Sequence, residues 1–214
     1  MIFATPRRRY TPRARANDRR PLTTFHPLSV VGQRLLCYNG AMSKPLPTAV
    51  QSQHILDFIS HSAAQTIRVG QRLGELMRQG DLVVLLGDFG AGKTHLIKGI
   101  AQGLGSTDLV NSPSFVLINE YRAGPRHAHM PIFHADLYRI EDPDELASIG
   151  IEESWSGIGV CLIEWADQAG DWLPTERLAI HLQHLSETKR VLRFVPYGAR
   201  YQALLAEFKK TAVA

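Results

Sequence analysis

The sequence predicts an α/β protein in which helices flank a sheet within a single domain. Residues 82–86, Leu-Val-Val-Leu-Leu, form a continuous apolar run of strand length, which is typical of a strand buried on both faces. A glycine-rich turn follows, and residues 94–104 then carry apolar side chains at helical spacing up to Gly105. Further strand and helix patterns alternate along the chain, which favours a sheet with its ligand site at the carboxyl ends of the strands.

The helix expected before this strand has a clear beginning. Residues 62–65, Ser-Ala-Ala-Gln, fit a capping box. An apolar stripe then leads to Gly80, where we expect the helix to end; its members are Val69, Leu73, Leu76 and Met77.

The elements expected after the glycine-rich turn follow from the same patterns. Strand patterns occupy residues 115–121, 132–138 and 159–165. Two shorter segments alternate apolar with polar residues, so we expect a half-exposed closing pair of strands at 178–182 and 191–195. The remaining segments are a turn at 111–114, a loop at 124–129, a short helix capped by Asp142 with Pro143 at its first position, and a last helix carrying Leu204, Leu205 and Phe208 on one face.

The amino-terminal part of the chain differs in composition from the rest. Residues 1–42 hold eight arginines against one acid, a net charge of +7, whereas the whole chain carries +4, so residues 43–214 carry −3. We expect residues 1–50 to be a disordered basic extension and residues 51–214 to be the folded domain. Three interpretations of the extension stand: an over-extended gene model with translation starting at Met42, an organelle-targeting peptide, or a basic arm that touches RNA.

Composition limits the class of protein further. With 214 residues, 44% apolar and 21% charged, the chain has the size and balance of one ordinary soluble domain. No window approaches the roughly 18 uninterrupted apolar residues that a membrane span needs. The two cysteines, Cys37 and Cys161, do not form a disulfide scaffold in our interpretation, and we expect a cytoplasmic protein.

The glycine-rich turn carries the chemistry. Residues 87–94, Gly-Asp-Phe-Gly-Ala-Gly-Lys-Thr, fit the P-loop pattern G-x-x-x-x-G-K-[ST] between a strand and a helix. Glycines let the backbone turn tightly and aim N–H groups at phosphate oxygens, at the positive end of the helix dipole. Lys93 is expected to reach the terminal phosphates and Thr94 to bind Mg²⁺, which predicts a site for a nucleoside triphosphate.

A P-loop also needs an acidic group near Mg²⁺, and two candidates follow apolar strand patterns. Glu164 comes directly after the run 160–163; the alternative is a solvated carboxylate at a strand end. Asp136 lies inside an apolar segment, where a carboxylate is costly unless it is paired or bound to metal; the alternative partners are Arg139 or a backbone donor.

Neighbouring polar residues have structural and functional interpretations. His134 is on the same face as Asp136 if the segment is a strand, and we interpret it as a hydrogen-bonded structural group rather than a base. Ser112 and Ser114 are turn formers that could also sense the γ-phosphate. His127 and His129 lack cysteine partners, so we expect no zinc site.

Four stretches together resemble a known family. They are residues 87–94, Ser-Pro-Ser-Phe at 112–115, His-Ala-Asp-Leu-Tyr-Arg at 134–139 and Ile-Glu-Trp at 163–165. Their order and spacing are similar to those of the TsaE (YjeE) P-loop ATPases, over roughly residues 55–195. The resemblance implies a cytosolic ATPase that acts with TsaD and TsaB subunits to make threonylcarbamoyladenosine on tRNA, where slow ATP hydrolysis resets the complex.

The resemblance also implies roles for individual residues. Asp136 and Glu164 belong to the metal and hydrolysis site together with Lys93 and Thr94, and Ser-Pro-Ser-Phe corresponds to a switch-like loop. Two departures from the family pattern are Ser114, where the family usually has Thr, and His95, where it often has Thr or Ser. We expect ATP to contact Gly87, Asp88, Gly90, Ala91, Gly92, Lys93, Thr94, His95 and Trp165.

Two other functions remain open from the sequence. A small-molecule P-loop kinase would need an acceptor pocket and lid arginines, for which Arg122 and Arg126 are candidates. A nucleotide-gated assembly module would bind the nucleotide without significant turnover. The three possible functions differ in the fate of the phosphate group, which is transferred to water, to a small acceptor, or not at all.

Overall fold

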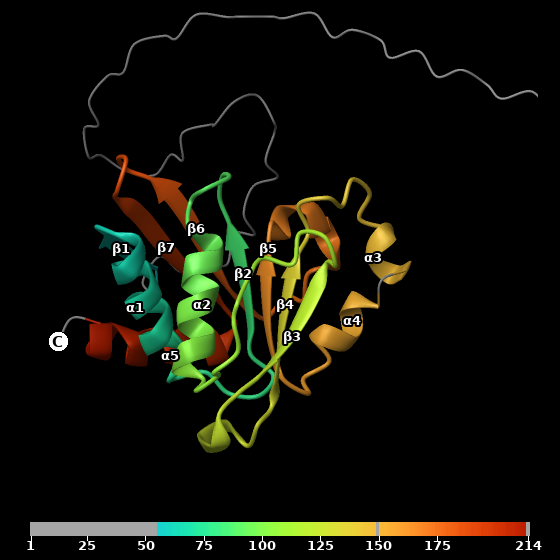
Figure 1. Cartoon of the computed structure of the whole chain (residues 1–214), viewed down its shortest axis with the longest axis horizontal. Coiled ribbons are helices and arrows are strands. Elements are labelled where there is room, and N and C mark those ends of the chain that lie inside the picture. Colours follow the sequence, from blue (N-terminus) through green and yellow to red (C-terminus); the bar gives the residue numbers. More distant parts are fainter. Residues whose placement is uncertain (1–54, 149, 213–214) are drawn as a thin grey trace, which may run out of the picture. The chain divides into compact units, whose positions relative to one another are not determined.

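A computed structural model describes residues 55–148 and 150–212 of the chain (Figure 1). The predicted basic extension, and with it the choice among its three interpretations, lies outside these residues. None of the helices in the described ranges has the length and apolarity needed to cross a bilayer.

A seven-stranded mixed sheet forms the centre of the described residues (Figure 1). Its spatial order is β1-β7-β6-β2-β5-β4-β3. The four neighbours β6, β2, β5 and β4 are parallel, whereas β7 and β3 run antiparallel to their partners. The strands are β1 (Leu56–Ser60), β2 (Leu82–Leu86), β3 (Ile118–Arg122), β4 (Pro131–Asp136), β5 (Val160–Glu164), β6 (Arg177–His184) and β7 (Arg190–Tyr197).

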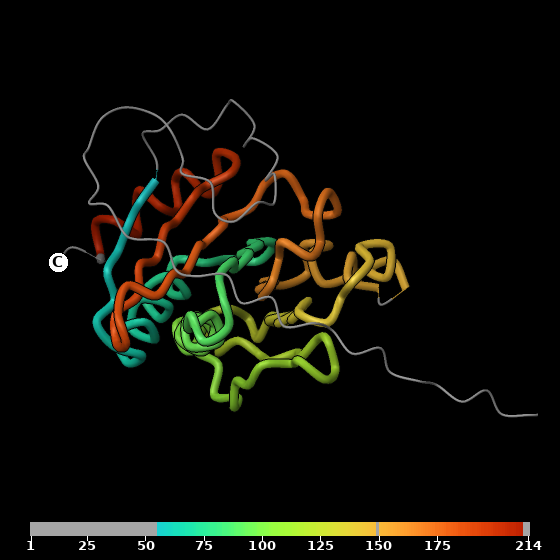
Figure 2. Tube along the Cα trace, turned by 90° about the horizontal axis from the view of Figure 1, so that it is seen from above, coloured from blue at the N-terminus to red at the C-terminus, as the bar shows by residue number. Residues whose placement is uncertain are grey.

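Helices cover both faces of the sheet, which confirms the predicted fold class (Figures 1 and 2). On one face pack α1 (Ala63–Gly74), α2 (Lys93–Gly103) and α5 (Ala199–Ala212). The other face carries shorter elements, namely α3 (Glu145–Ser148), α4 (Ile151–Ser154) and the 3₁₀ segment η3 (Ala166–Trp172). A further 3₁₀ turn, η2 (Pro125–His127), precedes β4.

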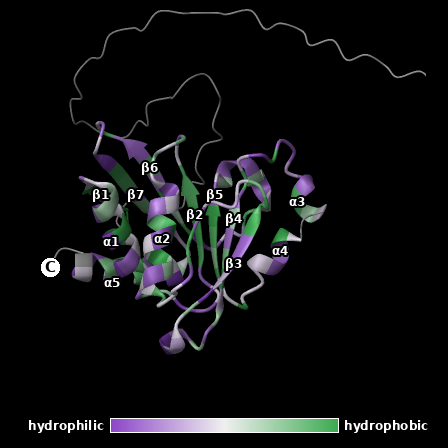
Figure 3. Ribbon diagram, in the orientation of Figure 1, coloured by the Kyte–Doolittle hydropathy of each residue, from purple (hydrophilic) through white to green (hydrophobic). Residues whose placement is uncertain are grey.

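Strand β2 is buried on both faces, as its apolar run predicts. Val83 and Leu85 belong to the core beneath α1 and α2, whereas Leu82 and Val84 belong to the core on the opposite face. Figure 3 shows the central strands as hydrophobic and the outward helix faces as mixed. The strand that leads into the site is thus fixed by apolar packing on both sides.

The start of β2 is also tied to α5 by polar groups. The Leu82 N–H donates to the Tyr201 hydroxyl at 2.7 Å, and burial raises the pKa of Tyr201 to about 12. Arg200 donates to both carboxylate oxygens of buried Asp81, at 2.8 and 2.6 Å. Because these contacts link residues 119 positions apart in sequence, they brace the strand against the last helix of the described chain.

Helices α1 and α2 approach each other through glycines. Gly70 and Gly74 of α1 face Gly99 and Gly103 of α2. A Cβ atom added at any of the four would collide with the backbone of the opposite helix, for example at Gly99 with the carbonyl oxygen of Ile67. The close contact is possible because glycine has no side chain, and it fixes the helix that begins in the site.

Several predicted boundaries shift. The capping box is confirmed, since Gln65 N–H donates to Ser62 Oγ at 3.1 Å, but α1 ends at Gly74 instead of continuing toward Gly80. The chain continues from there in tight turns, with Met77 N–H donating to Gly74 O, so Met77 still packs in the core. Of the apolar stripe, Val69, Leu73 and Met77 are buried and Leu76 is partly buried, although Leu76 and Met77 lie beyond the end of the helix.

The strand predicted at 115–121 begins only at Ile118. Residues 113–117 form a turn in which the N–H groups of Val116 and Leu117 both donate to Pro113 O, and Leu117 has φ of 65°. Likewise β4 ends at Asp136 rather than at residue 138, and α3 begins at Glu145 after a turn in which Asp144 N–H donates to Asp142 Oδ1. Hydrogen bonds within local turns, from the backbone at 113–117 and from side chains at Asp136 and Asp142, thus compete with regular structure at these ends.

The carboxyl-terminal strands are longer and more central than predicted. The prediction of a half-exposed closing pair is wrong for β6, which lies between β2 and β7 and buries Leu178, Ala179, Ile180 and Leu182. Three elements were not predicted at all: β1, α4 and η3. The last helix is confirmed, and Leu204, Leu205 and Phe208 are buried.

Candidate functional site

The glycine loop, residues 87–92, connects the end of β2 to the start of α2. Three of its glycines have positive φ: 142° at Gly87, 74° at Gly90 and 99° at Gly92. At Gly87 a Cβ atom would also collide with the carbonyl oxygen of Leu182 in β6. Gly92 is the N-cap of α2 and offers no side-chain cap, so the first N–H groups of this helix face the loop unblocked by a capping side chain.

Lys93 is held against the loop. Its Nζ donates to the carbonyl oxygens of Gly87 at 2.7 Å and Asp88 at 3.1 Å, and stands 3.7 Å from the centre of the Trp165 ring. Desolvation lowers the pKa of Lys93, while the nearby carboxylates, Glu164 first among them, oppose that shift. The ammonium group therefore sits at the loop with carboxylates nearby.

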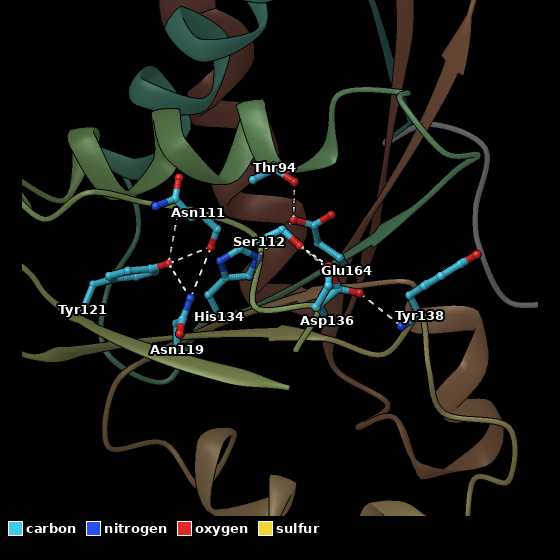
Figure 4. Close-up of polar contacts among 10 residues, drawn as sticks. Thr94, Asn111, Ser112, Asn119, Tyr121, His134, Asp136, Tyr138 and Glu164 are labelled. Atoms are coloured by element: carbon cyan, nitrogen blue, oxygen red, sulfur yellow. Dashed lines mark hydrogen bonds and ion pairs between the residues drawn. The ribbon is translucent and has the colours of Figure 1, made fainter. Parts of the chain in front are cut away.

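Glu164 ends β5 and faces the start of α2. Its Oε1 accepts a hydrogen bond from Thr94 Oγ1 at 2.7 Å and lies 3.0 Å from Nε2 of His134 (Figure 4). The carboxylate is 3% exposed, so the interpretation of Glu164 as a solvated strand end is wrong. Parallel pairing places Glu164 beside Asp136 of β4, which brings both predicted acids to the same edge of the sheet.

Asp136 is bound by the loop that precedes β3. Its Oδ2 accepts hydrogen bonds from Ser112 Oγ at 2.6 Å and Ser114 Oγ at 2.8 Å, and its Oδ1 accepts from the Tyr138 N–H at 3.1 Å. Arg139 is not its partner, because the Arg139 guanidinium lies over the Phe115 ring at 4.6 Å. The backbone donor that the sequence allowed is present, and the two serine hydroxyls add to it.

These groups surround a cleft of about 330 Å³, a size typical of ligand sites. Of the predicted site residues, Gly87 and Asp88 do not line it but supply the carbonyl groups that hold Lys93. The kinase-lid candidates Arg122 and Arg126 do not line it either. The predicted residues that do line the cleft are Gly90, Ala91, Gly92, Lys93, Thr94, His95, Asp136, Glu164 and Trp165.

Aromatic residues that the sequence interpretation missed border the cleft. Tyr138 packs against Trp165 with ring centres 5.0 Å apart and against Phe89 at 6.4 Å. Phe89 and Tyr138 are 82% and 52% exposed, which is unusual for large apolar rings. Trp165 itself has φ of 56°, a strained conformation for a tryptophan, and this turn directs its ring over Lys93. Phe89 and Tyr138 both lie within the motif stretches, and this position in the sequence could have indicated an aromatic border.

A second cleft, of about 390 Å³, adjoins the first across the glycine loop. The two clefts share Gly90, Gly92 and His95. The other walls of the second cleft come from the start of α1, from Glu187 and Thr188 in the turn between β6 and β7, and from Arg190 at the start of β7. The loop thus separates an acidic cleft from a second cleft on the β6 side.

The protein atoms alone do not make a metal cage. Over the residues that the structure describes, no group of three or more His, Cys, Asp or Glu side chains could hold a metal ion. Mg²⁺, however, is usually bound by one or two carboxylates together with phosphate oxygens and water. Thr94, Asp136 and Glu164, all on one cleft, fit that requirement when a phosphate group supplies the other ligands.

The fold and this site define the class of protein: an α/β protein with a P-loop NTPase-like sheet, a glycine loop that enters a helix, and acids at the ends of neighbouring strands. Residues 60–192 match the family model described as threonylcarbamoyl adenosine biosynthesis protein TsaE. The chain therefore belongs to the TsaE family, as the four motifs indicate.

Individual relatives agree with this assignment. The chain is 40% identical over 146 residues to the tRNA threonylcarbamoyladenosine biosynthesis protein TsaE of Bacillus subtilis, covering 68% of this chain and 89% of the relative. The protein of the same name in Treponema pallidum is 37% identical over 132 residues, covering 62% and 94%. The crystal structure of Bacillus subtilis YdiB superposes with a TM-score of 0.63 at 34% identity, over 74% of this chain and 96% of that one.

Proposed function

We propose that this protein binds ATP with Mg²⁺ and hydrolyses it slowly, as a subunit of the machinery that makes threonylcarbamoyladenosine on tRNA. One observation carries the proposal: a glycine loop, a buried lysine and two buried carboxylates converge on a single cleft. Phosphate binding needs the first two, and phosphoryl transfer to water needs a group that orients or deprotonates the water.

In this proposal the triphosphate follows the glycine loop. The N–H groups at the start of α2 and the Lys93 ammonium bind the phosphate oxygens, and the γ-phosphate lies toward Glu164. The phosphate chain then runs past Gly92 and His95, so the nucleoside enters the second cleft on the β6 side. Support comes from the three residues that the two clefts share.

The acidic side of the cleft supplies the chemistry of hydrolysis. Mg²⁺ bound with the nucleotide neutralises charge on the phosphate oxygens, and Thr94, Asp136 and Glu164 are the residues that would hold it. Glu164 orients the attacking water and accepts its proton, since its carboxylate lies on the cleft beside Thr94. Trp165 and Tyr138 cover this end of the cleft with apolar surface, which limits the entry of other water.

The Ser112–Ser114 segment is the part of the site that we propose to respond to the nucleotide. Both hydroxyls donate to Asp136 Oδ2, and the two serine oxygens are only 2.6 Å apart. Metal or phosphate at Asp136 competes for these hydrogen bonds, so the segment rearranges when the γ-phosphate arrives or leaves.

Membership of the TsaE family supports the proposed pathway and partners. The relatives are named for the biosynthesis of threonylcarbamoyladenosine on tRNA. We propose that this chain acts in the same pathway with TsaD and TsaB subunits, in the cytoplasm. The buried Cys161 thiol, whose pKa is raised by desolvation, is unpaired, which fits a reducing compartment.

Phosphate release from ATP tests the proposal. We expect slow release by the full chain alone and faster release when TsaD and TsaB are added. The variants Lys93→Ala and Glu164→Ala should lose both the basal and the stimulated release. Transfer of phosphate to a small acceptor would instead identify a kinase, and nucleotide binding without release in any mixture would identify an assembly module.

A further inference from the structure

His134 lies behind Glu164, outside the lining of the acidic cleft, and is fully buried, with 0% exposure. Its Nε2 is 3.0 Å from Glu164 Oε1. Its Nδ1 is the single buried side-chain nitrogen or oxygen in the described part of the chain that has no hydrogen-bond partner. The Tyr121 ring is nearby at 6.2 Å, but its hydroxyl donates to Asn111 O (Figure 4).

The sheet explains why the ring meets the carboxylate. Side chains alternate along β4, so His134 and Asp136 share a face, and parallel pairing aligns Asp136 with Glu164 of β5. His134 therefore stands one step further from the cleft than Glu164, on the same face of the sheet, below its carboxylate. Its full burial, on a strand paired on both sides, gives the ring little freedom to turn.

We propose that His134 is a positioning residue for Glu164; the inference rests on the proposed ATP hydrolysis. Because an ionised carboxylate only accepts hydrogen bonds, Nε2 carries the hydrogen and donates it to Oε1. Oε1 also accepts from Thr94, so both donors hold the same oxygen. No hydrogen bond from the described residues ends on Oε2, so this second oxygen is left for the ligands of the cleft, the metal and the attacking water.

The partnerless Nδ1 argues against a role in packing alone. A buried histidine kept only for structure normally uses both ring nitrogens, and a site with an unpaired polar atom would be filled better by an apolar side chain. With the hydrogen on Nε2, Nδ1 is an unpaired acceptor rather than an unpaired donor. What the ring offers, and an apolar side chain does not, is one N–H aimed at Glu164.

A pair of variants of equal length separates the two roles. His134→Gln keeps an N–H group at about the same distance along the side chain as Nε2, whereas His134→Met fills the same space without an N–H group. We expect His134→Met to slow ATP hydrolysis by about 10- to 100-fold, the range typical when a residue that orients an active-site ligand is lost. Nucleotide affinity without Mg²⁺, followed by intrinsic tryptophan fluorescence, should stay within about twofold, because His134 does not line the cleft. His134→Gln should recover most of the rate.

Two results would overturn the inference while leaving the proposed function intact: wild-type turnover by His134→Met, or equal losses in both variants. Equal losses would mean that the ring matters for packing and the N–H does not. Thermal unfolding of both variants accompanies the assay, and we expect His134→Met to unfold no earlier than His134→Gln.

A measurement without nucleotide keeps the inference separate from ATP hydrolysis. Imidazole ¹⁵N NMR of the full chain should show His134 with its hydrogen on Nε2 and Nδ1 unprotonated, and the Nε2 resonance should shift in Glu164→Ala. If the wild-type protein hydrolyses no ATP, the proposed function is wrong, and this result does not depend on any His134 variant. The positioning role itself is overturned if the hydrogen is on Nδ1, or if the Nε2 resonance does not shift in Glu164→Ala.

Discussion

The two sides of the cleft are built in different ways. On one side the glycine loop and α2 use the backbone: carbonyl groups hold Lys93, and glycines let α2 approach α1. On the other side, carboxylates at the ends of β4 and β5 are held by side chains from the 112–114 loop, α2 and β4. The backbone side is rigid, whereas the carboxylate side depends on hydrogen bonds that a ligand can exchange.

Because the two sides differ in construction, we expect one side to determine phosphate binding and the other to determine hydrolysis. In the proposed function, the backbone N–H groups at the start of α2 and Lys93 bind the phosphate oxygens. In the same proposal the two carboxylates, each of which accepts hydrogen bonds from hydroxyl groups, respond to the metal and to the γ-phosphate. We therefore expect changes on the backbone side to alter nucleotide affinity or stability, and changes on the carboxylate side to alter turnover.

The largest expected effect concerns Lys93. Lys93→Ala removes a charged donor from the loop, and a charge-assisted contact of about 3 kcal/mol corresponds to a loss of about 100-fold in ATP affinity. Isothermal calorimetry with a non-hydrolysable ATP analogue measures it. Lys98→Ala, on the same helix but outside the cleft, is the matched control. Equal affinities for the two variants would show that the loop does not bind the phosphates.

Next in size is the glycine contact between α1 and α2. Gly99→Ala places a methyl group against the Ile67 carbonyl, and we expect the free energy of unfolding to fall by about 2 kcal/mol, as overpacked sites do. Urea unfolding measures the change. Gln102→Ala, exposed on the same helix, should stay within about 0.5 kcal/mol of the wild type. A stable Gly99→Ala protein would contradict the rigid character of this side.

A smaller effect is expected for the hydrogen bonds that Ser112 and Ser114 donate to Asp136. Ser114→Ala removes one of two hydroxyl donors to Oδ2 and should lower the free energy of unfolding by about 1 kcal/mol. Its turnover should change more than its ATP affinity, since the change lies on the carboxylate side. Ser114→Thr keeps the hydroxyl and serves as the control. If affinity rather than turnover falls in Ser114→Ala, the division of tasks is wrong.

The smallest expected effect on the free energy of unfolding concerns an ion pair outside the cleft, which serves as a reference for changes on either side of the cleft. Arg193 of β7 donates to both carboxylate oxygens of Asp57 in β1 at 2.8 Å, and this contact lowers the pKa of Asp57. Since the folded-state pKa is depressed, the stabilisation is present above the unfolded pKa of about 3.9 and is lost as the pH falls through the folded value. Both side chains are about half exposed, so we expect less than about 1 kcal/mol.

Unfolding of the wild type and Asp57→Asn in urea at pH 7 and pH 3 checks this sign. The two proteins should differ at pH 7 and converge at pH 3. A difference that grows toward acid pH would contradict the direction of the pKa shift.

The sequence predicts the backbone side better than the carboxylate side, for a physical reason. Strand, loop and helix are contiguous at residues 82–103, so local pattern is sufficient there. Glu164 could be expected because it follows an apolar run, and Asp136 because it is a carboxylate inside an apolar segment. Their partners could not, since the contacts of Ser112 with Asp136 and of Thr94 with Glu164 span 24 and 70 residues and arise only when the sheet orders its strands.

The same reasoning explains what the sequence interpretation missed. Strand β1 pairs with β7, far along the chain, and its five residues carry little pattern of their own. The turn at 113–117 shortens β3 because its backbone bonds locally to Pro113, a choice that apolar content does not reveal. His134 was interpreted as hydrogen-bonded, and it is, but its partner Glu164 comes from another strand.

The most direct test of the account is the separation of binding from turnover at Glu164. In Glu164→Gln the side chain keeps its shape but cannot accept a proton from water. With TsaD and TsaB present, we expect single-turnover phosphate release to fall by about 100-fold or more, the scale of general-base catalysis, while ATP affinity stays within about threefold. Release at the wild-type rate, or a loss confined to affinity, would contradict the assignment of hydrolysis to the carboxylate side of the cleft.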